Sequence, residues 1–188
     1  MAGDERIRLF CALQLPPAAV DELAAWQVEQ LRSAPGGSSA NAPGRLVPPG
    51  NLHVTLAFLG ARPVDEVPAI ARELAEATRA AAPAELRPLG YRETRSVGMI
   101  LYEDPSRAAT ALTEALGERL EQLGVYRRER RPWLPHVTVL RFRERAGLTP
   151  ELTNIRSFRA VRTALYSSSL RPGGAQYEAL ETAALGGR

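Results

Sequence analysis

The sequence predicts an α+β fold with two pseudo-symmetric lobes, each an antiparallel sheet with helices on its outside, which enclose a central cleft. Two observations lead to this prediction. Strand-like and helix-like segments alternate along the chain, and the order strand, helix, strand around His53 is echoed around His136. These are the only two histidines, and each opens the same phrase, His-Val-Thr. Because no long linker or break in composition divides the chain, we expect one two-lobed domain over residues 1–188.

Seven short segments have the composition of β-strands. The first is an apolar run that ends at Pro16, and the run that contains His53 stops at Gly60; both residue types interrupt a sheet ladder. The last two are joined around Arg171-Pro172-Gly173-Gly174, which is typical of a tight turn. The predicted strands span residues 7–15, 52–59, 85–93, 96–102, 135–142, 158–169 and 176–182.

Three segments have apolar residues at helical spacing. Proline pairs suit the start of a helix, and glycine suits its end. The stretch 34–44 is rich in Gly, Ser, Pro and Asn and predicts a loop. The predicted helices run from Pro17 to about Ser33, from near Asp65 to just before Pro83, and from Asp104 to Gly124.

Composition excludes several classes of protein. Hydrophobic residues make up 45% of the chain and charged residues 24%, as in globular proteins. No apolar stretch is long enough to span a membrane, and the acidic N-terminus does not resemble a signal peptide, so we expect a cytoplasmic protein without a membrane partner. The single cysteine, Cys11, lies in an apolar run, which favours a buried structural thiol.

All 24 basic residues are arginines, because the chain contains no lysine. A GC-rich genome would explain this bias, and so would recognition of phosphate groups, which planar guanidinium groups suit. The stretch from Arg127 to Arg145 holds seven arginines and two glutamates, and it surrounds the second His-Val-Thr phrase. We therefore expect an anionic substrate.

The repeated phrase places paired side chains on one face of a strand. Residues i and i+2 of a strand share a face, so His53 lies beside Thr55, and His136 lies beside Thr138. Two histidines can supply a general acid and a general base near neutral pH. Neither phrase has a carboxylate at metal-ligand spacing, and no phosphate-binding or dinucleotide-binding glycine loop is present, so we expect no metal and no cofactor.

A histidine on a half-buried strand is more often a hydrogen-bonded structural residue than a catalyst. A given histidine is followed by Val-Thr by chance in roughly one case in 300. Because both histidines of this chain have that sequence after them, the repeat favours a catalytic role.

The two phrases in their context, His53-Val-Thr-Leu-Ala-Phe-Leu-Gly60 and Pro135-His-Val-Thr-Val-Leu-Arg141, resemble the paired motifs of the two-histidine phosphoesterases. More narrowly, the chain resembles the RNA 2′,3′-cyclic phosphodiesterases, once called 2′-5′ RNA ligases. The resemblance extends to residues 8–16, 49–52 and 165–177. It departs from the usual pattern at Leu46, where the family has tryptophan, and at Val139-Leu140, where Leu-Ala is commoner.

The resemblance implies metal-independent hydrolysis of RNA 2′,3′-cyclic phosphate ends to 2′-phosphomonoesters. It implies that His53 is the proton donor, that His136 is the proton acceptor, and that Thr55 and Thr138 hold the phosphoryl oxygens. The residues alone do not distinguish the acid from the base, because the two phrases are nearly identical.

Further substrate contacts are predicted around these four residues. Arg141 lies five places after His136, so a regular strand would point it away, whereas a twist or bulge would return it for a phosphate contact; a structural ion pair is the alternative. Arginines of the basic stretch are candidates to guide the RNA backbone, and aromatic residues are candidates to stack on bases or to pack in the core. The arginines are Arg128, Arg130 and Arg131, and the aromatic residues are Phe10, Tyr91, Tyr102 and Trp133.

Two other functions remain open at this point. The same fold could bind RNA or a nucleotide without turnover, although intact His and Thr residues in both copies count against that. A related enzyme could act on a small cyclic nucleotide or on a 2′-5′ linkage, although the arginine-rich stretch favours a polyanion. We expect a monomer that acts on RNA.

Overall fold

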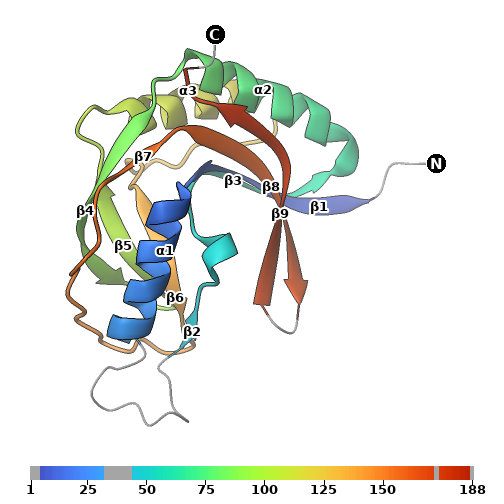
Figure 1. Cartoon of the computed structure of the whole chain (residues 1–188). Helices are drawn as coiled ribbons and strands as arrows, with labels where there is room; N and C mark the ends of the chain where they lie inside the picture. Colours follow the sequence, from blue (N-terminus) through green and yellow to red (C-terminus); the bar gives the residue numbers. More distant parts are fainter. Residues whose placement is uncertain (1–4, 32–43, 172–173, 187–188) are drawn as a thin grey trace.

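The computed structural model describes residues 5–31, 44–171 and 174–186 (Figure 1). The strands are β1 (Arg6–Gln14), β2 (Arg45–Leu46), β3 (His53–Pro63), β4 (Ala84–Glu93), β5 (Val97–Glu103), β6 (His136–Arg141), β7 (Phe158–Ala160), β8 (Arg162–Arg171) and β9 (Gly174–Ala184). The α-helices are α1 (Pro17–Trp26), α2 (Val67–Ala80) and α3 (Ala108–Gln122), and a π turn, Gln27–Leu31, follows α1. The predicted loop at 34–44 lies, except for its last residue, outside the described residues.

The strands form one antiparallel sheet, which confirms the predicted α+β class. Their order is β7-β4-β5-β6-β3-β1-β8-β9, and β2 adds to β6. The two histidine strands, β3 and β6, lie side by side in the middle. The expectation of a separate sheet for each lobe was therefore wrong, because these two strands join the halves, while the pseudo-symmetry of the halves stays a prediction.

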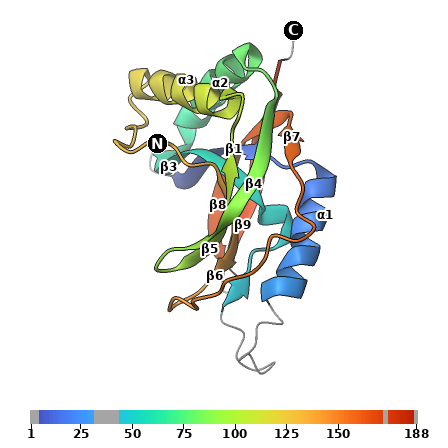
Figure 2. The ribbon, with the colours of Figure 1, turned by 90° about the vertical axis from the view of Figure 1, so that its left-hand side faces the viewer.

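The predicted strand 158–169 is in fact two strands. Ala160 ends β7, which pairs with β4, and Arg162 begins β8, which pairs with β1. Val161 between them accepts a backbone hydrogen bond from Leu185 (2.9 Å). Because β7 and β8 adjoin in the chain but belong to opposite halves of the sheet, the sheet has to curl, as Figures 1 and 2 show. Both pieces are extended, so the sequence pattern carries no sign of the break.

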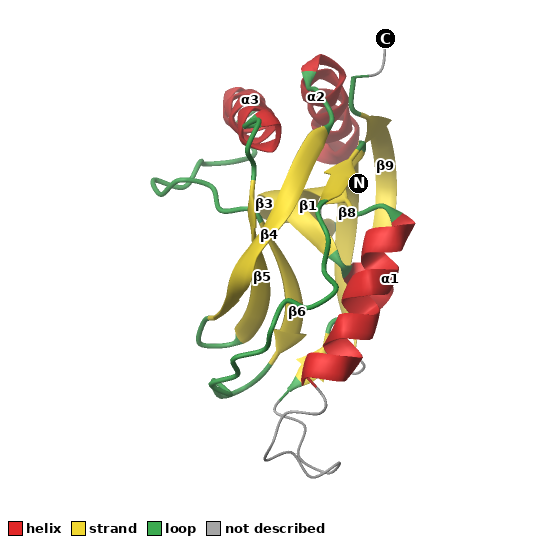
Figure 3. Cartoon of the chain, turned by 60° about the vertical axis from the view of Figure 1, so that its left-hand side comes forward, coloured by secondary structure: helices red, strands yellow, loops and turns green. Residues whose placement is uncertain are grey.

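A row of core side chains crosses the sheet on one face. Each residue of the row pairs with the next on the neighbouring strand, so all six point the same way. The ring of Trp26 on α1 lies 6.2 Å from one end of the row, and Thr78 on α2 hydrogen-bonds to the other end. Helices α1 and α2, well separated in Figure 3, thus cover the same face. The row is Tyr91, Ile100, Val137, Val54, Leu13 and Thr163.

Two predicted boundaries change in the structure. The first histidine strand does not stop at Gly60, because that glycine adopts a φ of 69° and the chain continues in the ladder to Pro63. The third helix begins at Ala108 instead of Asp104, whose carboxylate accepts hydrogen bonds from the backbone and hydroxyl of Thr110 (2.7 and 2.8 Å).

Cys11 is buried, as predicted, and burial raises the pKa of its thiol to about 12. None of the helices among residues 5–31, 44–171 and 174–186 is long and apolar enough to cross a membrane.

Candidate active site

The two His-Thr pairs meet where β3 lies beside β6. Val54 is directly opposite Val137, and both side chains are fully buried beneath the sheet. In antiparallel strands this register, continued by one residue on each side, sets His53 opposite Thr138 and Thr55 opposite His136. Because neighbours along a strand alternate between faces, these four side chains belong to the face that the helices leave uncovered.

Backbone carbonyls fix the tautomer of both histidines. Nδ1 of His53 lies 2.7 Å from the carbonyl oxygen of Asn51, and Nδ1 of His136 lies 2.8 Å from that of Leu134. A carbonyl oxygen only accepts, so in each neutral ring Nδ1 carries the hydrogen and Nε2 presents a lone pair. Nε2 of His53 is 3.1 Å from the Thr55 hydroxyl. Each ring can therefore exchange a proton with a substrate through Nε2.

Three aromatic rings surround His53. Phe10 lies 4.8 Å from its ring, Tyr177 approaches edge-on at 5.4 Å, and Tyr166 stacks on Phe10 at 5.0 Å. Burial lowers the pKa of His53 to about 4; the hydrogen bond to Asn51 opposes this shift, and the nearby charges of His136 and Arg141 add to it. The unliganded site therefore holds a neutral His53 at neutral pH.

The indole of Trp133 links the two histidine segments. Its Nε1 donates a hydrogen bond to the backbone oxygen of Thr55 (2.9 Å). Trp133 precedes His136 by three residues, and Thr55 follows His53 by two. Trp133, predicted as a candidate for base stacking, thus forms a hydrogen-bonded link between the two halves of the site.

A bulge in each histidine strand explains where Arg141 lies. On β5, Met99 pairs with Thr138 and Gly98 pairs with Leu140, so Val139 is an extra residue in β6. The same shift in β3 makes Leu56 an extra residue, and both bulges come three places after the histidine. Val139 and Leu140 are consequently both buried, and Arg141 returns to the side of His136.

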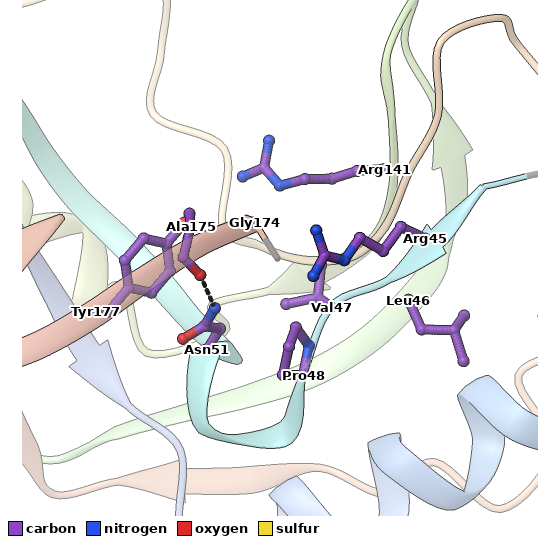
Figure 4. A pocket seen from close by; sticks show the side chains of 9 residues that line it. All are labelled: Arg45, Leu46, Val47, Pro48, Asn51, Arg141, Gly174, Ala175 and Tyr177. Atoms are coloured by element: carbon purple, nitrogen blue, oxygen red, sulfur yellow. Dashed lines mark hydrogen bonds between the residues drawn. The ribbon is translucent and has the colours of Figure 1, made fainter. Parts of the chain in front are cut away.

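Arg141 lines a small pocket with Arg45, Asn51 and Tyr177 (Figure 4). Arg45 is directly opposite Arg141 in the pairing of β2 with β6. Among the described residues, no carboxylate forms an ion pair with either guanidinium group. Like charges directly opposite each other destabilise a sheet. This pair is therefore suited to an anion that would neutralise it.

The other predicted RNA contacts occupy different settings. Arg128 forms ion pairs with Glu121 (2.6 Å) and Glu118 on α3, and Arg131 pairs with Glu129. Arg130 is exposed. Phe10 is only 3% exposed, so it supports the His53 ring and offers almost no surface to a base.

Sequence reasoning missed four residues of the site, among them Tyr177, which contacts the His53 ring. Arg45 and Tyr166 have no neighbouring motif residue, and only the strand pairing brings them to the site. Asn51 donates a hydrogen bond from its side chain to the Ala175 oxygen (2.8 Å) while its own carbonyl holds His53. The turn that it ends, Pro49–Asn51, was the available sequence signal.

Among the described residues, no group of three or more His, Cys, Asp or Glu side chains could hold a metal ion. The polar groups that the site does offer are two imidazoles, two threonine hydroxyls and two guanidinium groups, a set suited to binding an anion and moving protons.

Comparison with known proteins identifies the family of the chain. A family model of the 2′-5′ RNA ligase superfamily matches residues 19–171. An RNA 2′,3′-cyclic phosphodiesterase of Escherichia coli (strain K12) is 26% identical over 178 residues, which cover 95% of this chain and 96% of that protein. A protein of the same name from Thermus thermophilus is 32% identical over 157 residues, 75% of each chain.

A solved structure is also similar. The crystal structure of E. coli LigT complexed with NADP+ superposes with a TM-score of 0.76 and 27% sequence identity, covering 97% of this chain and 100% of that one. The fold and most of the sequence therefore agree with the family model, and the chain belongs to the 2′-5′ RNA ligase superfamily.

Proposed function

We propose that this protein is an RNA 2′,3′-cyclic phosphodiesterase, which hydrolyses the cyclic phosphate at an RNA end to a 2′-phosphomonoester without a metal. The observation that carries the proposal is the register at Val54 and Val137, which sets each histidine opposite the threonine of the other phrase. The names of the two curated relatives support the reaction, and the NADP+ complex of the similar LigT supports a nucleotide ligand.

The reaction needs one proton acceptor and one proton donor. Nε2 of His136 takes a proton from water as the water oxygen bonds to phosphorus. The bond from phosphorus to the 3′ oxygen breaks, and Nε2 of His53 gives its proton to that oxygen. Thr55 and Thr138 donate hydrogen bonds to the non-bridging oxygens, whose negative charge they stabilise. The assignment of donor and acceptor follows the family resemblance.

The depressed pKa of His53 ties its protonation to substrate binding. Burial, and to a smaller extent the positive charge of Arg141, disfavour the imidazolium in the unliganded site. A phosphodiester anion beside Nε2 favours the charged ring and raises the pKa of His53. The proton donor is therefore charged mainly when a substrate is present.

Arg141 and Arg45 supply the anion-binding part of the proposal. The β6 bulge returns Arg141 to the side of His136, and its charge helps to lower the pKa of His53, which supports a contact with the reacting phosphoryl group. Arg45, opposite Arg141, extends the positive charge away from the histidines along β2. We assign Arg45 to a neighbouring phosphate of the RNA backbone, because a polyanion satisfies two adjacent guanidinium groups better than one phosphate does.

The decisive experiment is product analysis with an oligoribonucleotide that ends in a 2′,3′-cyclic phosphate, in buffer with EDTA. We expect a 2′-phosphate product. The single variants His53→Ala and His136→Ala should each lower kcat by about 10²–10⁴-fold, the usual contribution of a general acid or base.

Three results would contradict the proposal. Loss of activity with EDTA would reject the metal-free reaction, and a 3′-phosphate product would reject the assigned geometry. Tight binding of the cyclic-ended RNA with no turnover would identify a binding module instead. A matched series with a small cyclic nucleotide and a 2′-5′-linked dinucleotide would show whether RNA is the preferred substrate.

A further inference from the structure

Gln27 is a buried polar side chain beneath the arginine pair. It is 2% exposed and begins the π turn that follows α1. Its side-chain Nε2 donates hydrogen bonds to two backbone oxygens, those of Val139 (2.6 Å) and Val47 (3.0 Å). An amide nitrogen has two hydrogens, and both are used here. A buried amide is costly unless it is hydrogen-bonded, so these two contacts account for a glutamine at an apolar position.

The two oxygens belong to the segments that carry the arginines. Val139 is the extra residue of the β6 bulge, and Arg141 follows it by two positions. Val47 directly follows β2, and Arg45 precedes it by two positions. The Val47 amide also donates to the Val139 oxygen (3.0 Å), so the two segments are hydrogen-bonded to each other here. The Gln27 side chain is therefore hydrogen-bonded to both segments at the point where they meet.

We propose that Gln27 is a positioning residue, which holds the β6 bulge and the end of β2 so that Arg141 and Arg45 are presented together at the anion site. Without the bulge, the alternation of β6 would turn Arg141 to the buried face. The hydrogen bonds of the Gln27 side chain go to backbone oxygens and not to either guanidinium group, so it acts through the strands that carry the arginines. The inference rests on the proposed function only in taking the anion to be a phosphate of the substrate.

The variant Gln27→Met tests this role, because methionine has a similar length and cannot donate a hydrogen bond. The Val139 oxygen keeps its bond from the Val47 amide, so the variant is expected to fold. We expect its affinity for inorganic phosphate, measured by calorimetry, to fall about tenfold, and KM for cyclic-ended RNA to rise more than kcat falls.

A double-mutant cycle separates positioning from a general loss of stability. In the background Arg45→Ala/Arg141→Ala, Gln27→Met should change phosphate affinity by less than about twofold, since the groups it positions are gone. Thr78→Val is the matched control: it removes the buried hydroxyl on α2 that hydrogen-bonds to Thr163 of β8, and it should lower stability while leaving phosphate affinity unchanged.

The inference is overturned if Gln27→Met leaves phosphate affinity unchanged, or lowers it by the same factor with and without the two arginines. The calorimetric measurement needs no turnover. If the protein bound phosphate but did not hydrolyse cyclic-ended RNA, the proposed function would fail while the role of Gln27 would still be decided.

Discussion

Val54 and Val137 face each other where β3 meets β6, and they are the one residue pair that joins these strands in the described sheet. The two halves of the site therefore depend on a short contact, supplemented by the hydrogen bond from Trp133 to the Thr55 oxygen. Small changes at this junction should therefore alter the distance and orientation between the His53 and His136 rings.

Replacing Trp133 by phenylalanine should lower both stability and activity. It leaves the Thr55 oxygen without its donor, which should reduce the free energy of unfolding by about 1–2 kcal/mol. The control is Trp26→Phe, which removes an equivalent indole hydrogen bond to the Glu151 oxygen (2.7 Å) on the other face of the sheet. Urea unfolding should give similar losses for both variants, and kcat should fall several-fold more for Trp133→Phe. Equal kcat values for the two variants would contradict the role of Trp133 in linking the two histidine segments.

The two histidines should titrate differently in NMR spectra. The chain has only two histidine rings, and the variant His136→Asn assigns their signals. We expect a pKa of about 4 for His53 in the free protein, because burial disfavours its charged form. Addition of inorganic phosphate should raise that pKa. A free-protein value near 6.5, or no response to phosphate, would contradict the coupling of protonation to anion binding.

The same shift predicts how stability depends on pH. The folded-state pKa of His53, about 4, lies below its ordinary value of 6.5, so the unfolded chain takes up a proton first as the pH falls. His53 therefore reduces the free energy of unfolding progressively between about pH 6.5 and pH 4, and has no such effect above pH 6.5. Urea titrations across this range should be flatter for His53→Gln than for the natural protein. If the free energy of unfolding depended on pH in the same way in both proteins, the lowered pKa of His53 would be contradicted.

Removing either arginine of the pair should weaken substrate binding and relieve strain in the sheet. Arg141→Ala should lower kcat/KM by about 10²-fold, since a charge-assisted contact to the reacting group is lost, and Arg45→Ala should mainly raise KM. Both variants should be as stable as the natural protein or more so, because two like charges no longer oppose each other. The exposed Arg143 is the control, and an equal loss of kcat/KM in Arg143→Ala would indicate a non-specific effect of charge.

Much of this site could be read from the sequence, because its chemistry lies in local patterns. The period-two spacing of His53 and Thr55 determines their common face, whatever the rest of the chain does. The position of Arg141 depended on a bulge at Val139, and a valine gives no sign that it is an extra residue in a ladder. Arg45 and Gln27 were missed because only strand pairing and helix packing bring them to the site.

The break at Val161 was hidden for a related reason. Strand propensity reports that a residue is extended, and the identity of its partner strand depends on contacts far away in the chain. Residues 158–171 are extended on both sides of the break, so a single strand was the natural prediction.

The exchange of partners at Val161 also constrains the order of folding. Among the described strands, β1 comes first in the chain, yet one of its two neighbours, β8, is among the last. During synthesis on the ribosome, β1 can pair with β3 but keeps an open edge until most of the chain has emerged. An open strand edge invites pairing with other chains. A nascent chain that stalls before Arg162 should therefore be prone to aggregation, which makes rapid completion of the segment from Arg162 onward a requirement for efficient folding.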